Sequence, residues 1–220
     1  MSIDPIKVSE RIEDEYRSYL RSSFPIADAT LNRDFDRQLQ GEFPLTRGPL
    51  LEATPPYENG ASVRDLVERG VLSQGFLEFS EEALPLDRPL YLHQEEALLR
   101  AADGRNLLIA TGTGSGKTEC FLLPIVDALL REKEAGTLNQ PGVRAMLLYP
   151  MNALANDQLK RLRVLLKDFP EITFGRYTGE TRQTTKKAEQ DFRSRYPGVK
   201  RLENELISRD EINEGPPKIL

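Results

Sequence analysis

The sequence has only one cysteine and one histidine among its 220 residues. A single thiol excludes an internal disulfide, and the lack of a cysteine and histidine cluster excludes the usual kind of zinc site. No run of 18 apolar residues occurs, so no transmembrane helix is predicted. Residues 1–10 lack the charged and then apolar pattern of a signal peptide. These absences favour a cytoplasmic protein without membrane contact.

The acidic net charge of −5 hides an asymmetry along the chain. Residues 1–85 contain 9 Lys and Arg against 16 Asp and Glu, a net charge of −7. Residues 86–220 contain 21 against 19, a net charge of +2. The two parts therefore need not share a partner, and the acidic average does not exclude a local surface that binds phosphate.

The residue pattern also changes between these parts. Residues 1–85 are predicted to form a mainly helical accessory region, in which two helices end near Phe24 and Gly41 and a turn-rich connector covers residues 54–60. Residues 86–220 alternate between helices and short apolar strands, which predicts an α/β fold with a parallel sheet covered on both faces. The expected strands are residues 105–110, 143–149, 172–177 and the opening of another at 216–220, and the expected helices are residues 91–103, 117–134 and 151–168, with mostly helical polar residues at 184–212.

A phosphate-binding loop, TGTGSGKT, lies between a predicted strand and a predicted helix. Its three alternate glycines allow a tight turn whose N–H groups point inward, and the positive end of the following helix strengthens this anion site. Lys117 would reach the β- and γ-phosphates of ATP and Thr118 would place its hydroxyl on Mg²⁺, so these two are the expected catalytic residues. The residues expected to contact the nucleotide are Thr111, Gly112, Thr113, Gly114, Ser115, Gly116, Lys117, Thr118 and Glu119.

The loop departs from the usual phosphate-loop pattern at Thr111, where a glycine is expected, and helicase-type loops commonly lack that glycine. LYLHQEEALL (90–99) precedes the loop, and YPMNALANDQ (149–158) and YTGET (177–181) follow it. In this order the segments resemble superfamily 2 helicases: a Q motif, the phosphate loop of motif I, motif Ia and the segment leading to motif Ib. The resemblance covers roughly residues 88–220.

The resemblance implies a RecA-like first motor domain, of which this chain holds an incomplete part, and it implies ATP and Mg²⁺ as cofactors. Gln94 lies 23 residues before Lys117, where the family's glutamine makes two hydrogen bonds to adenine. A side-chain amide suits that role because it offers one kind of donor and one kind of acceptor. Tyr91 could pack on the base or lie in the core, and His93 is expected to be a local hydrogen-bonding residue.

The resemblance also implies contact with nucleic acid, expected to be DNA, through the sugar-phosphate backbone. Pro150 and Asn152 lie at the strand-to-helix corner that makes this contact, and Thr178 and Gly179 would supply a second one. The family more often has threonine at Met151 and a basic residue at Asn152, which puts the side-chain roles in doubt but preserves backbone N–H contacts. A basic run follows on the same helix, for which a solvated face is favoured over nucleic-acid contact: Lys160, Arg161, Arg163 and Lys167.

Phrases in the N-terminal half add a narrower resemblance. FPIADATLNRDF (24–35), TPPY (54–57) and DRPLYLHQ (87–94) are similar to large bacterial helicases of the Lhr type and of DNA-repair and anti-phage defence systems such as DISARM and Druantia. The implied partners are proteins of such systems and the remaining motor domain of the same protein.

The hydrolytic half of an ATPase site is missing from the sequence. The family needs an acidic pair after an apolar strand, which holds Mg²⁺ and orients the attacking water. Asp14-Glu15 precedes the phosphate loop and Asp210-Glu211 follows no apolar strand, so neither pair fits. Arginine fingers and a second RecA-like domain are not recognisable either. We therefore interpret the chain as an N-terminal fragment that is inactive alone, within an ATP-dependent helicase or translocase.

Two other functions compete with this interpretation. One is a regulatory or interaction module that binds nucleotide without hydrolysing it. The other is a phosphate-loop kinase or transferase, which the spacing of Gln94 and the segment at 149–158 make less favourable.

Overall fold

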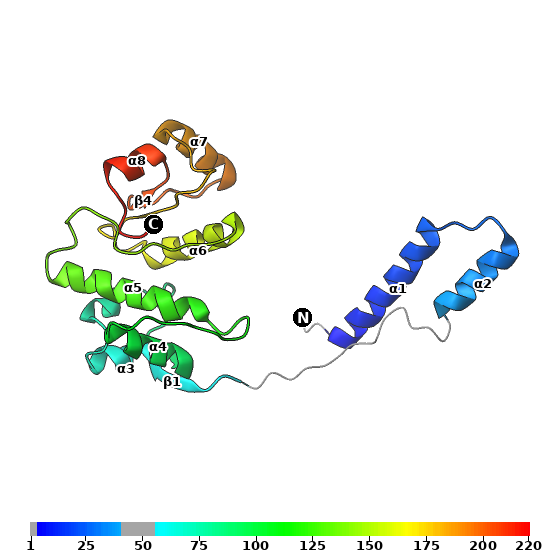
Figure 1. Cartoon of the computed structure of the whole chain (residues 1–220), viewed down its shortest axis with the longest axis horizontal. Coiled ribbons are helices and arrows are strands. Elements are labelled where there is room, and N and C mark those ends of the chain that lie inside the picture. The colour runs from blue at the N-terminus through cyan, green and yellow to red at the C-terminus, as the bar shows by residue number, and fades with distance from the viewer. Residues whose placement is uncertain (1–3, 41–55) are drawn as a thin grey trace. The chain divides into compact units, whose positions relative to one another are not determined.

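The computed structural model describes residues 4–40 and 56–220. Its internal contacts divide the chain into two compact units, Met1–Pro56 and Tyr57–Leu220 (Figure 1). Within the described ranges, no helix is both long enough and apolar enough to cross a membrane.

The described residues of the first unit form two helices, as the sequence predicted. Helix α1 (Pro5–Ser23) begins with a proline, which costs no hydrogen bond at that position, and ends directly before Phe24. Helix α2 (Ala29–Gln40) is joined to it by an ion pair of 2.7 Å between Arg21 and Asp36. Gly41, which was expected to end this helix, lies outside the described residues.

The second unit opens with a short antiparallel pair and a set of helices that reach the phosphate loop. Residues 57–85, which the sequence pattern grouped with the N-terminal region, contribute buried side chains to this unit's core. The capping box predicted at Ser62 and Asp65 is present. The elements are β1 (Asn59–Ser62), α3 (Val63–Glu68), the 3₁₀ helix η1 (Gln74–Glu78), β2 (Pro89–Tyr91), α4 (Leu92–Ala102) and α5 (Lys117–Glu134).

The rest of this unit contains short parallel segments covered by helices. Strand β3 (Phe174–Gly175) pairs in parallel with β4 (Glu205–Leu206), and Ile219 forms parallel bridges to Ala145 and Phe174. The strand predicted to open at 216–220 is therefore confirmed at its end. These pairings agree with a RecA-like fold, although the parallel sheet is formed only in part. The accompanying helices are α6 (Asn152–Leu165), α7 (Thr185–Arg195) and α8 (Arg209–Glu214).

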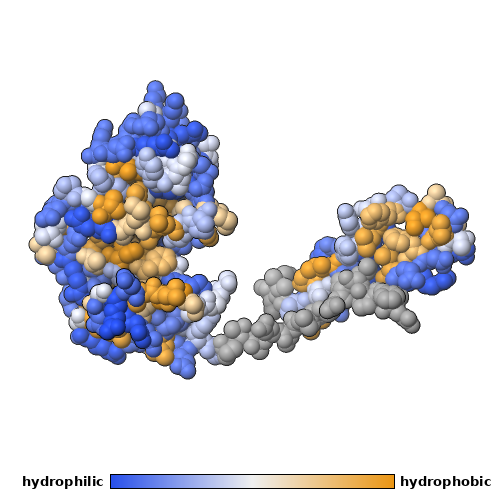
Figure 2. All heavy atoms as spheres, viewed as in Figure 1, coloured by the Kyte–Doolittle hydropathy of each residue, from blue (hydrophilic) through white to orange (hydrophobic). Residues whose placement is uncertain are grey.

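The prediction of a buried strand at residues 105–110 is wrong for this structure. These residues pair with no strand in the described chain, and Leu108 is 95% exposed. The segment at 143–149 pairs only through its middle, and Leu148 is 83% exposed. An apolar run becomes a buried strand only when neighbouring strands cover its edges, and the described residues supply none beside 105–110. Figure 2 shows apolar residues at the surface of both units.

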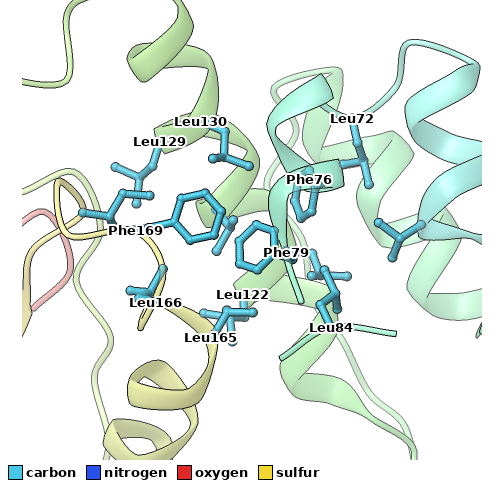
Figure 3. Close-up of a cluster of buried hydrophobic side chains, with 14 of the residues drawn as sticks. Leu72, Phe76, Phe79, Leu84, Leu122, Leu129, Leu130, Leu165, Leu166 and Phe169 are labelled. Atoms are coloured by element: carbon cyan, nitrogen blue, oxygen red, sulfur yellow. The ribbon is translucent and has the colours of Figure 1, made fainter. Parts of the chain in front are cut away.

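Helix α5 is the centre of the hydrophobic core. Phe76 and Phe79 approach it from the N-terminal side of the sequence, and Leu166 and Phe169 approach it from the segment after α6 (Figure 3). The rings of Phe79 and Phe169 lie 4.3 Å apart between centroids, so the two groups of residues also meet each other. The buried side chains of α5 are Cys120, Leu122, Leu123, Val126, Leu129 and Leu130.

One buried amide organises the loop that follows α6. The Nδ2 of Asn204 lies 2.9, 2.9 and 3.0 Å from the carbonyl oxygens of Leu166, Phe169 and Ile172, and its two hydrogens are shared among these three acceptors. The backbone carbonyl oxygen of Asn204 accepts from the N–H of Phe174 at 2.9 Å, which aligns β3 with β4. Because Asn204 is 2% exposed, water cannot replace these bonds.

We expect Asn204→Asp to lower the free energy of unfolding by about 3 kcal/mol or more, because a carboxylate would face three carbonyl oxygens in a buried place. The loss should grow as pH rises above about 4. Burial raises the folded-state pKa of the introduced carboxyl group, so the folded state binds more protons than the unfolded state.

Denaturant titrations of the wild type, Asn204→Asp and the exposed control Asn139→Asp at several pH values measure this effect. The control should stay within about 0.5 kcal/mol of the wild type. An Asn204→Asp variant as stable as the control would show that the three carbonyl contacts do not organise this loop.

Candidate nucleotide-binding site

The phosphate loop lies directly before α5, as the sequence predicted. Gly114 and Gly116 adopt left-handed backbone angles, with φ of +80° and +73°, which other residues adopt only at a cost. Gly116 is the N-cap of α5, and no side chain caps this helix. The first N–H groups of α5 are therefore left without a side-chain acceptor, next to a turn that only glycine forms easily.

Inside the loop, polar groups hold one another in place. The hydroxyl groups of Thr111 and Ser115 lie 2.6 Å apart, and Ser115 is fully buried. The Nζ of Lys117 donates to the carbonyl oxygens of Thr111 and Gly112 at 2.8 and 2.6 Å. The ammonium group therefore lies against the loop, close to where the sequence predicted a phosphate.

Side chains of the first turn of α4 form hydrogen bonds with the loop. Gln94 is 5% exposed, and its Nε2 donates to the carbonyl oxygen of Gly116 at 2.9 Å while its Oε1 accepts from the N–H of Tyr91 at 2.8 Å. The Nε2 of His93 lies 2.9 Å from the carbonyl oxygen of Ser115, so the proton of its imidazole belongs on that nitrogen. Two adjacent side chains of one helix thus bind two adjacent carbonyl groups of the loop.

An aromatic group beside the loop was not anticipated from the sequence. The ring of Tyr57 lies 5.2 Å from that of Tyr91 and 5.5 Å from that of His93, measured between centroids. A Cβ placed on Gly112 would come within 3.0 Å of the Tyr57 hydroxyl oxygen. Tyr57 belongs to a segment that the sequence pattern marked as a connector and as part of the TPPY phrase shared with large bacterial helicases, and no spacing signal relates it to the loop.

Glu119 was grouped with the nucleotide contacts, and the structure gives it a partner in the protein. Its Oε1 forms an ion pair with Arg161 of α6. Its Oε2 lies 3.1 Å from where a Cβ of Gly116 would be. Thr113 and Thr118 make no side-chain hydrogen bond among the described residues.

The residues expected to contact nucleic acid come together at the start of α6. Asn152 begins this helix, and its Nδ2 donates to the Oε1 of Glu180 at 3.2 Å, which joins it to the turn containing Thr178 and Gly179. The N-cap, Met151, provides no side-chain hydrogen bond to the helix. A groove of about 340 Å³ next to this corner is lined by apolar residues and by Tyr149, Asn152, Gln158, Arg176, Tyr177 and Thr178. Pro150 lies at the same corner, directly before Met151.

The basic run at residues 160–167, of which Lys167 lies after the end of α6, is not a free cationic face. Arg161 pairs with Glu119, and Lys167 pairs with Glu82 at 2.8 Å. Arg163 makes two hydrogen bonds, of 2.7 and 2.9 Å, to the buried carboxylate of Glu205. Burial lowers the pKa of Arg163, but the Glu205 carboxylate outweighs this and raises it above its usual value. Three of the four cations of this run are therefore neutralised within the chain.

The later acidic pair of the sequence contains Glu211, which is bonded to other groups of the protein. The Glu211 carboxylate caps its own helix through the N–H groups of Ile207 and Ser208 and also pairs with Arg201. Burial raises the pKa of Glu211, but these bonds outweigh it and the net pKa lies below its usual value. Among the described residues, no group of three or more His, Cys, Asp or Glu could hold a metal ion.

A glycine loop at the start of the buried helix α5, braced by a glutamine from α4, is the arrangement that the sequence predicted for a helicase-type α/β domain. Residues 91–199 match the family of DEAD/DEAH box helicases, and the chain belongs to this family. The predicted resemblance to superfamily 2 helicases is confirmed. No solved structure matches the chain.

Several curated proteins are similar to the chain. It is 37% identical to the Druantia protein DruE of Escherichia coli over 203 residues, 81% of this chain and 11% of DruE. It is 36% identical to the ATP-dependent helicase Lhr-Core of Sulfolobus acidocaldarius, over 40% of this chain and 11% of that protein. It is 32% identical to the uncharacterized ATP-dependent helicase YprA of Bacillus subtilis, over 45% of this chain and 13% of that protein. The chain thus spans about a tenth of the length of these relatives.

We expect Gly116→Ala to destabilise the chain more than Gly114→Ala. Both substitutions force an L-residue into a left-handed backbone, at a cost of about 1 kcal/mol each. At position 116 the new Cβ would also lie 2.3 Å from the Nε2 of Gln94, whereas at position 114 no atom lies within 4 Å.

Denaturant titrations of both variants, each also combined with Gln94→Ala, separate the two costs. In the Gln94→Ala background, Gly116→Ala should lower the free energy of unfolding by less than it does in the wild type. The loss caused by Gly114→Ala should be the same in both backgrounds. Equal losses for the two alanine variants would contradict the observed contact between Gln94 and the loop.

Proposed function

We propose that this chain is the ATP-binding part of an ATP-dependent helicase or translocase and that it also supplies part of the nucleic-acid backbone contact. The observation that carries the proposal is the brace between Gln94 and Gly116. It links the residue expected to recognise adenine to the loop expected to bind the phosphates. A phosphate loop alone would suit many nucleotide-binding proteins, and this link favours the helicase arrangement.

The hydrogen-bonding capacity of Gln94 supports adenine recognition. Its amide nitrogen carries two hydrogens and gives one to Gly116, and its Oε1 has two lone pairs and offers one to Tyr91. These bonds fix which end of the amide is the oxygen. One donor and one acceptor remain, which is the set that the N7 and N6 edge of adenine requires.

The loop residues fit a triphosphate with its magnesium ion. The backbone N–H groups of residues 112–116 and the start of α5 would bind phosphate oxygens, and Lys117 would exchange its two carbonyl acceptors for phosphate oxygens. The Thr118 hydroxyl would contribute one ligand to Mg²⁺, which when bound neutralises phosphate charge. Thr111, Thr113 and Ser115 would also contact the nucleotide, and the hydroxyl pair of Thr111 and Ser115 holds the loop in shape.

Nucleic-acid contact would involve the corner formed by Pro150 and Asn152 together with Thr178 and Gly179. These residues lie at one place, and the uncapped start of α6 offers N–H groups to a phosphate. Because most cations of α6 are neutralised, binding would rely on backbone groups and would be weak and independent of sequence. We propose DNA as the nucleic acid.

The wider setting is proposed from the relatives. One relative is named as a Druantia protein, which supports partners in a defence system, and the Lhr-Core relative is named as a helicase. We propose that the protein moves along DNA in the cytoplasm. This movement would also need the remaining motor domain of the same protein. ATP hydrolysis would require carboxylates and arginines that the present sequence does not supply.

The ATP preference should depend on Gln94. We expect Gln94→Ala to reduce the ratio of ATP to GTP affinity by about 5- to 150-fold, which corresponds to the loss of roughly 1–3 kcal/mol of hydrogen bonding to the base. Competition titrations with both nucleotides and Mg²⁺ measure this ratio.

His93→Ala is the matched control, because it removes the neighbouring brace on Ser115 without touching the base-reading group. It should weaken both nucleotides equally. A wild type that binds ATP and GTP with equal affinity would remove Gln94 as the reader of adenine.

The 220-residue chain should bind Mg-ATP without DNA-stimulated hydrolysis. Lys117→Ala should weaken binding by about 10-fold or more, because it removes charged hydrogen bonds of roughly 1.5–3 kcal/mol, while circular dichroism stays unchanged. Calorimetry and a phosphate-release assay with single-stranded DNA provide the measurements. Lys117-dependent hydrolysis by this chain would mean that a catalytic carboxylate lies within it.

A further inference from the structure

An ion pair connects the nucleotide loop to the helix that begins at the candidate nucleic-acid contact. Glu119 is the third residue of α5, two positions after Lys117, and its carboxylate pairs with the guanidinium of Arg161 on α6. Arg161 lies nine residues after Asn152, so about 14 Å of helix separates it from the start of α6.

The Glu119 carboxylate lies where a negative charge affects the loop. Its side chain is 12% exposed, and its Oε2 is buried without a hydrogen-bond partner among the described residues. That oxygen lies beside the α-carbon of Gly116, the last residue before the helix. A carboxylate at a helix N-terminus occupies the favourable field that would otherwise attract a phosphate, and it repels a triphosphate directly.

Arg161 is the counter-charge for this carboxylate. In residues 4–40 and 56–220, Arg161 is the one cation within ion-pair distance of Glu119. The nearby Lys117 instead donates to the carbonyl oxygens of Thr111 and Gly112. The pair closes only when α6 lies against α5. The charge presented to the loop therefore depends on the position of α6.

We propose that Arg161 is a positioning residue for the nucleotide site, which acts by neutralising Glu119 and so couples nucleotide affinity to the position of α6. The inference rests on the proposed nucleotide function. By linkage, a bound triphosphate favours the closed pair and holds α6 in place, and any ligand that moves α6 changes nucleotide affinity by the same factor. The start of α6 carries Asn152, so nucleic acid is the ligand placed to exert this effect.

Titration of the 220-residue chain with a fluorescent ATP analogue and Mg²⁺ tests the proposal in four proteins: wild type, Arg161→Ala, Glu119→Gln and the double variant. Arg161→Ala should weaken binding by at least about fivefold, the lower end of typical couplings. In the Glu119→Gln background, the same change should alter affinity by less than about twofold, because no negative charge remains to be exposed. Arg161→Lys, which keeps the charge, should restore most of the affinity.

Lys160→Ala is the matched control, since Lys160 is the exposed neighbouring cation and has no carboxylate within ion-pair distance in the described ranges. It should leave affinity within about twofold of the wild type, with thermal unfolding followed for every protein. Equal losses from Arg161→Ala in both backgrounds, or no loss in either, would overturn the coupling while leaving the proposed function intact. A wild type that binds no nucleotide would contradict the proposed function itself.

Discussion

The burial of α5 is the constraint on which the rest of the second unit depends. Its apolar residues pack against the segments before the loop on one side and against the residues after α6 on the other, and Val126 and Leu129 are fully buried. A helix held along its length cannot slide or rotate at its first residue. Lys117 and the uncapped N–H groups are therefore presented at a fixed place, which an anion site made of backbone groups requires.

Polar contacts from the neighbouring helices fix the position of the loop relative to the core. His93 and Gln94 bind consecutive loop carbonyl groups from α4, and Arg161 binds Glu119 from α6. Each contact comes from a helix that also packs against the core around α5, so the loop receives its geometry from helices on both sides. The hydrogen bonds add direction, and the core supplies the free energy that keeps the helices together.

The parts of this arrangement that are local in sequence could be predicted, and the parts that depend on distant pairing could not. The helix at 117–134 and the capping box of Ser62 follow from periodicity and short-range spacing, and α5 has the predicted bounds. The assignment of Gln94 to the Q motif came from its spacing to Lys117 together with the helicase resemblance, and its role at the base stays a prediction. The pairing of Arg161 with Glu119 and the position of Tyr57 have no such signal, because charge runs and turn segments look alike whether or not a distant partner meets them. The strand at 105–110 failed for the related reason that pairing, and not apolar composition alone, makes a strand.

The two ends of the phosphate loop differ in burial. Leu108 is three residues before Thr111 and is 95% exposed, whereas Ser115 and Cys120, on the other side of the loop, are at most 1% exposed. The loop is thus fixed where it enters α5 and held only by hydrogen bonds where the chain arrives. Thr111 marks this difference, because its hydroxyl contact with Ser115 and its carbonyl contact with Lys117 are what connect the arriving chain to the fixed end. Glycine at this position could not replace threonine in this contact, because glycine has no hydroxyl group to bond to Ser115.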